Sequence, residues 1–192
     1  EYDLIDFAEL CLRNPTCLTS KNELLLIWDE FNHQITFYNK DLQIIKKIGL
    51  QDQISSVSFM SYNENSNYLC LTDSKKNKIY IYDLNREKIS HIIDSKTIEG
   101  RMKSPANTLI LGNNKLIIAD QFNNRVLIYN LDSNESYIWL TFGRNGNEKV
   151  RKPIHFCLSK RFIYVFDYHN YLIQVFDHNL NFQYQIGGKV HL

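Results

Sequence analysis

The 192-residue sequence has no excess of charge of either sign. It holds 22 Lys+Arg and 21 Asp+Glu, which gives a formal net charge of +1 with histidine neutral. This balance excludes a polybasic nucleic-acid domain and an acidic tail protein, although a local basic patch is compatible with it. The apolar runs, such as residues 24–28, are far shorter than the roughly 18 residues that a membrane-spanning helix needs. The sequence therefore predicts no membrane span.

Secretion and disulfide signals are also lacking. No basic start precedes an apolar stretch with a small-residue cleavage site, although an upstream leader stays open because residue 1 is Glu. The cysteines form no C-x-x-C pair, and three of them lie in apolar, strand-like runs, which favours buried, reduced thiols over disulfides. Together these patterns favour an intracellular location. The four cysteines are Cys11, Cys17, Cys70 and Cys157.

Turn-forming residues are few, with 7 Gly and 3 Pro, while Asn recurs in most of the candidate turns. Asn tolerates the left-handed backbone conformation and can hydrogen-bond within a turn, so it can replace Gly there. At 44% hydrophobic residues the chain can bury a substantial core and is too apolar for a disordered protein. We therefore expect a folded domain rich in short turns.

An internal repeat organises the sequence. Four segments share one plan, in which an apolar run ends in Asp, a polar turn follows, and an alternating run ends in Asn or Asp; they cover residues 24–39, 68–83, 115–130 and 162–177. The anchoring aspartates are 44, 47 and 47 residues apart, at Asp29, Asp73, Asp120 and Asp167. Such regular spacing is typical of a repeat protein.

Each unit is predicted to hold four strands. Its two central runs are joined by a shorter amphipathic outer strand (residues 42–48, 89–93, 137–142 and 182–186) and by an upstream inner strand (residues 16–19, 54–59, 108–111 and 154–158). Meandering four-stranded units of this length are typical of an all-β fold, the β-propeller. We expect blades at about 15–50, 51–95, 105–146 and 153–188 within a domain of residues 15–192. Residues 1–14 form an N-terminal segment that could supply a ring-closing strand.

Residues 118–130, with the sequence IADQFNNRVLIYN, resemble the NHL repeat, and Thr141-Phe142-Gly143 is similar to the usual end of an NHL blade. The resemblance covers roughly residues 15–188 and is strongest in the third and fourth units. Because NHL propellers most often have six blades, four visible blades imply either a closed four-bladed ring or part of a larger propeller. In this family the Asp and Asn-Arg positions look structural, which implies that Asp120 and Arg125 fix a turn.

Catalytic motifs are lacking: the sequence has no G-x-S-x-G, no H-E-x-x-H and no glycine-rich phosphate loop followed by a helix. An aspartate that recurs in every unit also favours a structural role over a catalytic one. His155 is a weak metal candidate, because Cys157 shares its face of an inner strand. Some NHL-like enzymes are metal-dependent lyases, but they need several such histidines. We therefore expect no enzyme activity and no cofactor, with a metal-dependent lyase or hydrolase as an alternative.

A basic run lies around the loop between the third and fourth units, and it could contact RNA phosphates: Arg144, Lys149, Arg151 and Lys152, followed by Lys160 and Arg161. Trp139 and Tyr137, two apart on an outer strand, could be exposed at a partner surface. The sequence favours a protein-interaction or assembly scaffold, with an RNA-binding propeller as the alternative. Open blade edges also make a homo-oligomer conceivable.

Overall fold

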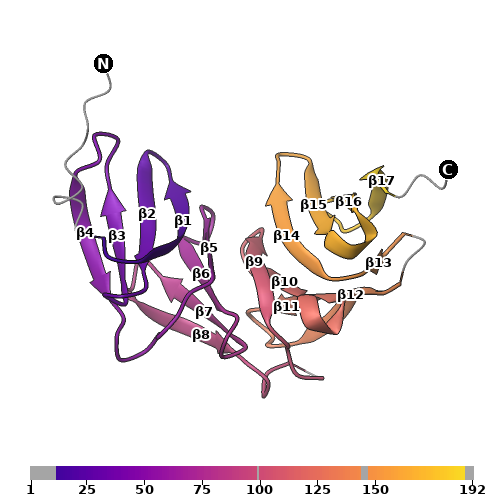
Figure 1. Ribbon diagram of the computed structural model, residues 1–192, viewed down its shortest axis with the longest axis horizontal. Coiled ribbons are helices and arrows are strands. Elements are labelled where there is room, and N and C mark those ends of the chain that lie inside the picture. Colours follow the sequence, from indigo (N-terminus) through magenta and orange to yellow (C-terminus); the bar gives the residue numbers. More distant parts are fainter. Residues whose placement is uncertain (1–11, 99, 144–146, 189–192) are drawn as a thin grey trace.

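The computed structural model describes residues 12–98, 100–143 and 147–188. Four antiparallel sheets are arranged as a four-bladed β-propeller, with consecutive strands side by side in each blade (Figure 1). In blade 1 the strands are β1 (Pro15–Lys21), β2 (Leu24–Asp29), β3 (Gln34–Tyr38) and β4 (Ile44–Gly49). In blade 2 they are β5 (Phe59–Asn63), β6 (Tyr68–Asp73), β7 (Lys78–Asp83) and β8 (Lys88–Ile93).

The other two blades have the same plan, so the expected propeller is confirmed. Blade 3 consists of β9 (Pro105–Leu111), β10 (Lys115–Asp120), β11 (Arg125–Asn130) and β12 (Ser136–Phe142). Blade 4 consists of β14 (Pro153–Leu158), β15 (Phe162–Asp167), β16 (Leu172–Asp177) and β17 (Phe182–Gly187). Two 3-10 turns, η1 (Gln121–Asn123) and η2 (Tyr168–Asn170), link the central strands, and the short β13 (Lys149–Val150) pairs in parallel with β12.

Asparagine does replace glycine in many turns. Five asparagines have a positive φ, between 51° and 58°, in the tight connections between strands: Asn22, Asn67, Asn77, Asn124 and Asn134. The left-handed conformation is less unfavourable for Asn than for most residues, because its short amide can hydrogen-bond locally. The low glycine content is therefore compatible with a chain of closely spaced turns.

The inner strand of blade 2 lies further along the chain than the sequence predicted. The expected range was 54–59, whereas β5 begins at Phe59 and ends at Asn63. Ile54 and Val57 are buried, but they belong to the connection from blade 1 and fill the space between the two blades. Their apolar character reflects this packing, and an apolar run alone does not distinguish a packed connection from a strand.

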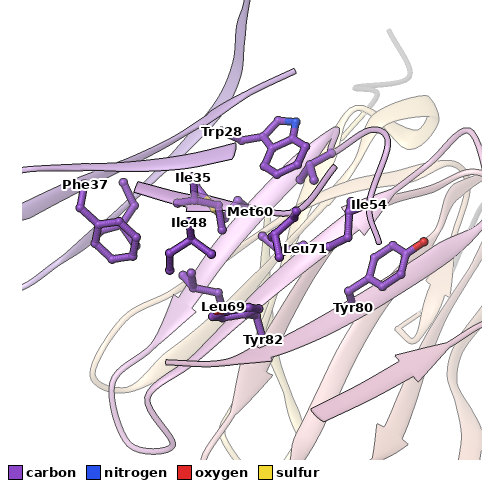
Figure 2. Packing of buried hydrophobic residues seen from close by; sticks show 13 residues of the cluster. Trp28, Ile35, Phe37, Ile48, Ile54, Met60, Leu69, Leu71, Tyr80 and Tyr82 are labelled. Carbon is purple, nitrogen blue, oxygen red and sulfur yellow. The ribbon is translucent and has the colours of Figure 1, made fainter. Parts of the chain in front are cut away.

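The hydrophobic core lies between blades, in three clusters. The first joins blades 1 and 2, where Trp28 and Phe37 meet Leu71 and Tyr82 (Figure 2). The second joins blades 2 and 3, and the third joins blades 3 and 4. Within the described ranges no cluster of buried residues joins blade 4 to blade 1. The propeller is therefore packed at three successive blade interfaces.

Candidate binding face

One face of the propeller is formed by recurring turns, and we call it the turn face. It holds the turns between the second and third strands of the blades (residues 30–33, 74–77, 121–124 and 168–171) and the connections that lead into the inner strands. In a meandering blade these turns and connections lie at the same end, because successive strands run in opposite directions. The four aspartates of the repeat therefore all lie at this face.

Three of these aspartates make the same two contacts. One carboxylate oxygen accepts a backbone N–H from the connection before the inner strand: Arg13 to Asp29 at 3.0 Å, Lys103 to Asp120 at 2.7 Å and Arg151 to Asp167 at 2.9 Å. The side-chain amide three residues further on also donates to the carboxylate: Asn32, Asn123 and Asn170. Each turn is thereby fixed to the connection of its own blade, through a side chain that is fully buried.

The carboxylates differ in their ionisation. Burial opposes the charge of Asp29, but hydrogen bonds from Arg13, Asn32 and Asn14 outweigh it and lower the pKa of this carboxyl. For Asp167, burial outweighs the hydrogen bonds from Arg151 and Asn170 and raises the pKa. The same motif therefore holds two carboxyl groups whose contributions to the stability of the folded chain change with pH in opposite directions.

Arg125 lies next to Asp120 in the third blade. Its Nε is 2.7 Å from an Asp120 carboxylate oxygen, and one of its terminal nitrogens donates to the Gly100 carbonyl at 3.2 Å. The guanidinium thus joins the turn to the connection from blade 2, since its several donors can reach two acceptors at once.

Asp73 departs from the pattern. It accepts the Lys76 N–H at 2.8 Å, and its other carboxylate oxygen is buried with no hydrogen-bond partner in the structure. In this blade the Val57 N–H, which precedes the inner strand, donates instead to Glu30 of blade 1. Blade 2, whose inner strand alone does not begin with proline, is thus the blade whose aspartate lacks the upstream contact.

Asparagine side chains connect neighbouring blades at this face. Asn77, the last residue of the blade 2 turn, accepts the Ser104 N–H at 2.6 Å, and Asn124 accepts the Lys152 N–H at 2.9 Å. Both asparagines have a positive φ. The turns are therefore fixed both within a blade and between blades.

Exposed aromatic rings project from three of these rigid turns, at Phe31, Phe122, Tyr168 and Tyr171. Cations lie over several of the rings. The Arg13 guanidinium carbon is 4.9 Å from the Phe31 ring centroid, and the Lys152 Nζ is 5.8 Å and 5.2 Å from the rings of Phe122 and Tyr168. Such cation–π contacts hold exposed rings in place. The turn face thus presents fixed aromatic rings among positive charges.

The predicted basic run is divided between the two faces. Arg151 and Lys152 lie on the turn face, at the entry to blade 4, and Lys149 is exposed with its Nζ 2.8 Å from Thr141 Oγ1. Arg144 lies outside the described residues. Lys160 and Arg161 lie in the turn between β14 and β15, which is at the opposite end of the inner strand. The five described cations therefore do not form one continuous patch.

Trp139 is not an exposed partner residue, contrary to expectation. It packs against the cluster between blades 3 and 4, with its ring centroid 4.6 Å from that of Phe176, whereas Tyr137 is exposed. Trp139 occupies a β-bulge, because Val126 pairs with Leu140 while Leu127 pairs with Ile138. Tyr137 pairs with Ile128 of the same cluster, so both side chains lie on the side of blade 3 that faces blade 4, where Trp139 contacts Phe176 while Tyr137 is exposed.

His155 and Cys157 do share an exposed face of the inner strand β14. The His155 Nδ1 lies 2.7 Å from the amide nitrogen of Asn107, and its ring packs edge-on against Phe59 at 5.6 Å. Across the described part of the chain, no group of three or more His, Cys, Asp or Glu side chains is placed to hold a metal ion. His155 is thus oriented by neutral neighbours on the two preceding blades.

The cysteines are free, but only one of those described is fully buried. Cys70 is buried and Cys17 is partly buried, and burial raises the pKa of both thiols to about 12. Cys157 is exposed, which corrects the expectation of a buried thiol. The apolar run around it belongs to an end blade, whose outward side nothing in the described structure covers. Cys11 lies outside the described residues.

Comparison with known proteins supports the fold. No family model matches the chain, and the search of curated proteins gives no match. A solved structure described as KlHsv2 with loop 6CD replaced by a Gly-Ser linker is similar, with a TM-score of 0.60 and 9% sequence identity. The similarity covers 90% of this chain and 51% of the solved one, so this chain spans about half the length of that protein. Within the described ranges no helix is long and apolar enough to cross a membrane.

Proposed function

We propose that this chain is a non-enzymatic, NHL-like β-propeller that binds a protein partner through its turn face. The proposal rests on one observation, the set of exposed aromatic rings carried by turns that buried carboxylates hold in place: Phe31, Phe122, Tyr168 and Tyr171. Aromatic and arginine side chains dominate the binding energy of protein interfaces, because they bury a large area at a small loss of conformational freedom.

Rigidity supports a binding role for this face. The backbone of each turn is fixed before a partner arrives, so association would lose little loop entropy. Because Arg13 and Lys152 add positive charge beside the rings, the partner we expect carries an acidic, partly apolar segment. Nothing in this mechanism requires a nucleophile, a metal or a moving lid.

A display library of random peptides tests the proposal. Selection on the wild-type chain should enrich sequences with acidic and apolar residues. Combining Phe122→Ser with Tyr168→Ser should weaken binding of the selected peptides at least tenfold. The matched control combines Lys160→Ser with Arg161→Ser on the opposite face and should bind as wild type does. Peptides that bind the turn-face variant unchanged, or no enrichment at all, would contradict the proposal.

A second candidate, single-stranded RNA, is favoured by one feature of the same face. Lys152 lies between the rings of Phe122 and Tyr168, and alternating cations and rings can bind phosphates and stack bases. The division of the basic run between two faces counts against it. Binding of a fluorescent single-stranded polyuridine oligonucleotide distinguishes the two candidates. Affinity that is weakened by the turn-face variant and falls steeply with added salt would favour RNA over a protein partner.

A further inference from the structure

Blade 4 carries an apolar sheet face that points away from blade 3, and we call it the outward face of blade 4. By the pairing of opposite residues, its side chains come from all four strands of the blade: Cys157, Tyr164, Phe166, Ile173, Val175, Tyr184 and Ile186. Phe166, Tyr184 and Ile186 are exposed. An exposed apolar surface of this kind on a soluble domain indicates a binding surface.

The corresponding positions of blade 3 show what such a face normally does. Leu140 pairs with Val126 just as Ile186 pairs with Ile173, yet Leu140 is 0% exposed and Ile186 is 50% exposed. Ala119 and Phe166 each precede the repeated aspartate, and their exposures are 0% and 37%. In blade 3 these positions are buried because blade 4 packs on them. The outward face of blade 4 is thus a blade-packing surface that lacks its next blade.

Blade 1 carries the complementary face. Leu18 pairs with Ile27 as Met60 of blade 2 pairs with Leu71, but Met60, which packs against blade 1, is 1% exposed and Leu18 is 63% exposed. We call the face of a blade that is turned toward the next blade in the chain its trailing face, and the face turned toward the preceding blade its leading face. Each interface within the chain joins the trailing face of one blade to the leading face of the next, and the outward face of blade 4 is a trailing face. The trailing face of blade 4 and the leading face of blade 1 therefore carry exposed apolar side chains that no other described blade covers.

We propose that a second copy of this chain occupies the outward face of blade 4 with its own blade 1. Two copies related by a two-fold axis would make this contact twice, which uses both of these faces and closes the ring. The resulting eight blades lie within the range known for propellers. This chain covers 51% of the similar solved protein, so a second copy would add about as many residues as the rest of that protein holds. This inference is independent of the turn face and goes beyond the proposed function.

Cys157 provides a readout that requires no mutation, because its exposed thiol lies on the outward face of blade 4. Alkylation of Cys157, followed by peptide mass spectrometry, should slow at least tenfold as the protein concentration is raised through the dimerisation range. Light scattering after size exclusion should give about twice the chain mass of 22.8 kDa over that same range.

Variants distinguish this contact from other dimers. Phe166→Asp on blade 4 and Leu18→Asp on blade 1 should each produce monomers, because every contact in the ring uses both faces. The matched control is Tyr137→Asp, whose exposed side chain lies on the outer strand β12 of blade 3, and it should stay dimeric. A dimer that only Phe166→Asp disrupts would indicate that two blade 4 faces meet each other and would overturn the proposal.

A wild-type chain that stays monomeric at concentrations up to hundreds of micromolar, with Cys157 alkylated at a constant rate, would also overturn the proposal. The outward face would then belong to blades other than those of a second copy. Circular dichroism of each variant confirms that it is folded. If a variant fails to fold, the concentration dependence of Cys157 alkylation in the wild-type chain decides alone.

Discussion

Single residues explain why one aspartate recurs at the same point of every blade. In blades 1, 3 and 4 its carboxylate accepts donors from the turn and from the connection before the inner strand. A buried carboxylate is unfavourable unless hydrogen bonds compensate for its lost hydration, and here the backbone provides them. Asp29, Asp120 and Asp167 therefore fix local geometry, and they do so close to the candidate binding rings without being exposed themselves.

Asp29→Asn tests this role through its pH dependence. Near pH 7 the change should lower the free energy of unfolding by about 1–3 kcal/mol. The reason is that the NH2 group of Asn cannot accept the buried N–H groups that a carboxylate oxygen of Asp29 accepts. The pKa of Asp29 is lowered in the folded chain, so its contribution is present above the ordinary value of 3.8 and is lost as the pH falls through the folded-state pKa. Urea titrations from pH 7 to pH 3 should therefore show the deficit shrinking.

Asp167→Asn is the matched comparison and should behave in the opposite way. Burial raises the pKa of Asp167, so the folded wild type gains stability on protonation as the pH falls from that raised pKa towards 3.8. The deficit of this variant should grow over that interval. Equal pH dependence of the two deficits would contradict the assigned environments.

The cysteines differ in their expected reactivity. Because burial raises the pKa of Cys17 and Cys70 to about 12, neither forms an appreciable amount of thiolate at pH 8. In dilute solution, a thiol reagent with peptide mapping should label Cys157 in the native chain and should label Cys17 and Cys70 only after urea unfolding. Labelling of Cys70 at the same native rate as Cys157 would show that the interface between blades 2 and 3 opens readily.

Elements of the propeller are joined mainly by side chains. Neighbouring blades share no sheet, so the hydrophobic clusters and a few polar contacts, such as that of Asn124 with Lys152, hold them in order. A blade is therefore stable only when its faces are covered by its neighbours. This dependence explains why the exposed face of an end blade is informative.

Asn124→Ala should destabilise the chain by about 1–2 kcal/mol, since it removes the bond to the Lys152 N–H and places Ala at a φ of 51°. Asn124→Gly keeps the favourable backbone and loses only the amide, so its loss should be smaller. Thermal unfolding of the two variants separates the contributions. A fully neutral Ala variant would show that Asn124 does not connect the blades.

Trp139→Ala should cost about 3–5 kcal/mol because it opens a cavity beside Phe176, whereas Tyr137→Ala should change stability by less than about 0.5 kcal/mol. Chemical denaturation of both variants provides the measurement. A larger loss for Tyr137→Ala than for Trp139→Ala would contradict the packing of Trp139 against Phe176.

At the scale of the whole molecule, the sequence was sufficient to predict the repeat, the strand order and the four blades, because apolar runs and turn residues recur at a constant spacing. It could not show that residues 54–57 form a packed connection or that Trp139 packs against blade 4, since both depend on neighbouring blades. The aromatic rings of the turn face were also missed. A signal was present in the turns, where Phe31, Phe122 and Tyr168 follow closely after the aspartates Asp29, Asp120 and Asp167.

The most direct test of the binding face is amide hydrogen exchange of the wild-type chain, with and without a saturating peptide selected from the display library. If the turn face binds, protection should rise in residues 30–33, 121–124 and 168–171 and at the entry to blade 4, and should not change in residues 159–161. Protection confined to residues 159–161 or to the outer strands, with the turns unchanged, would contradict the account.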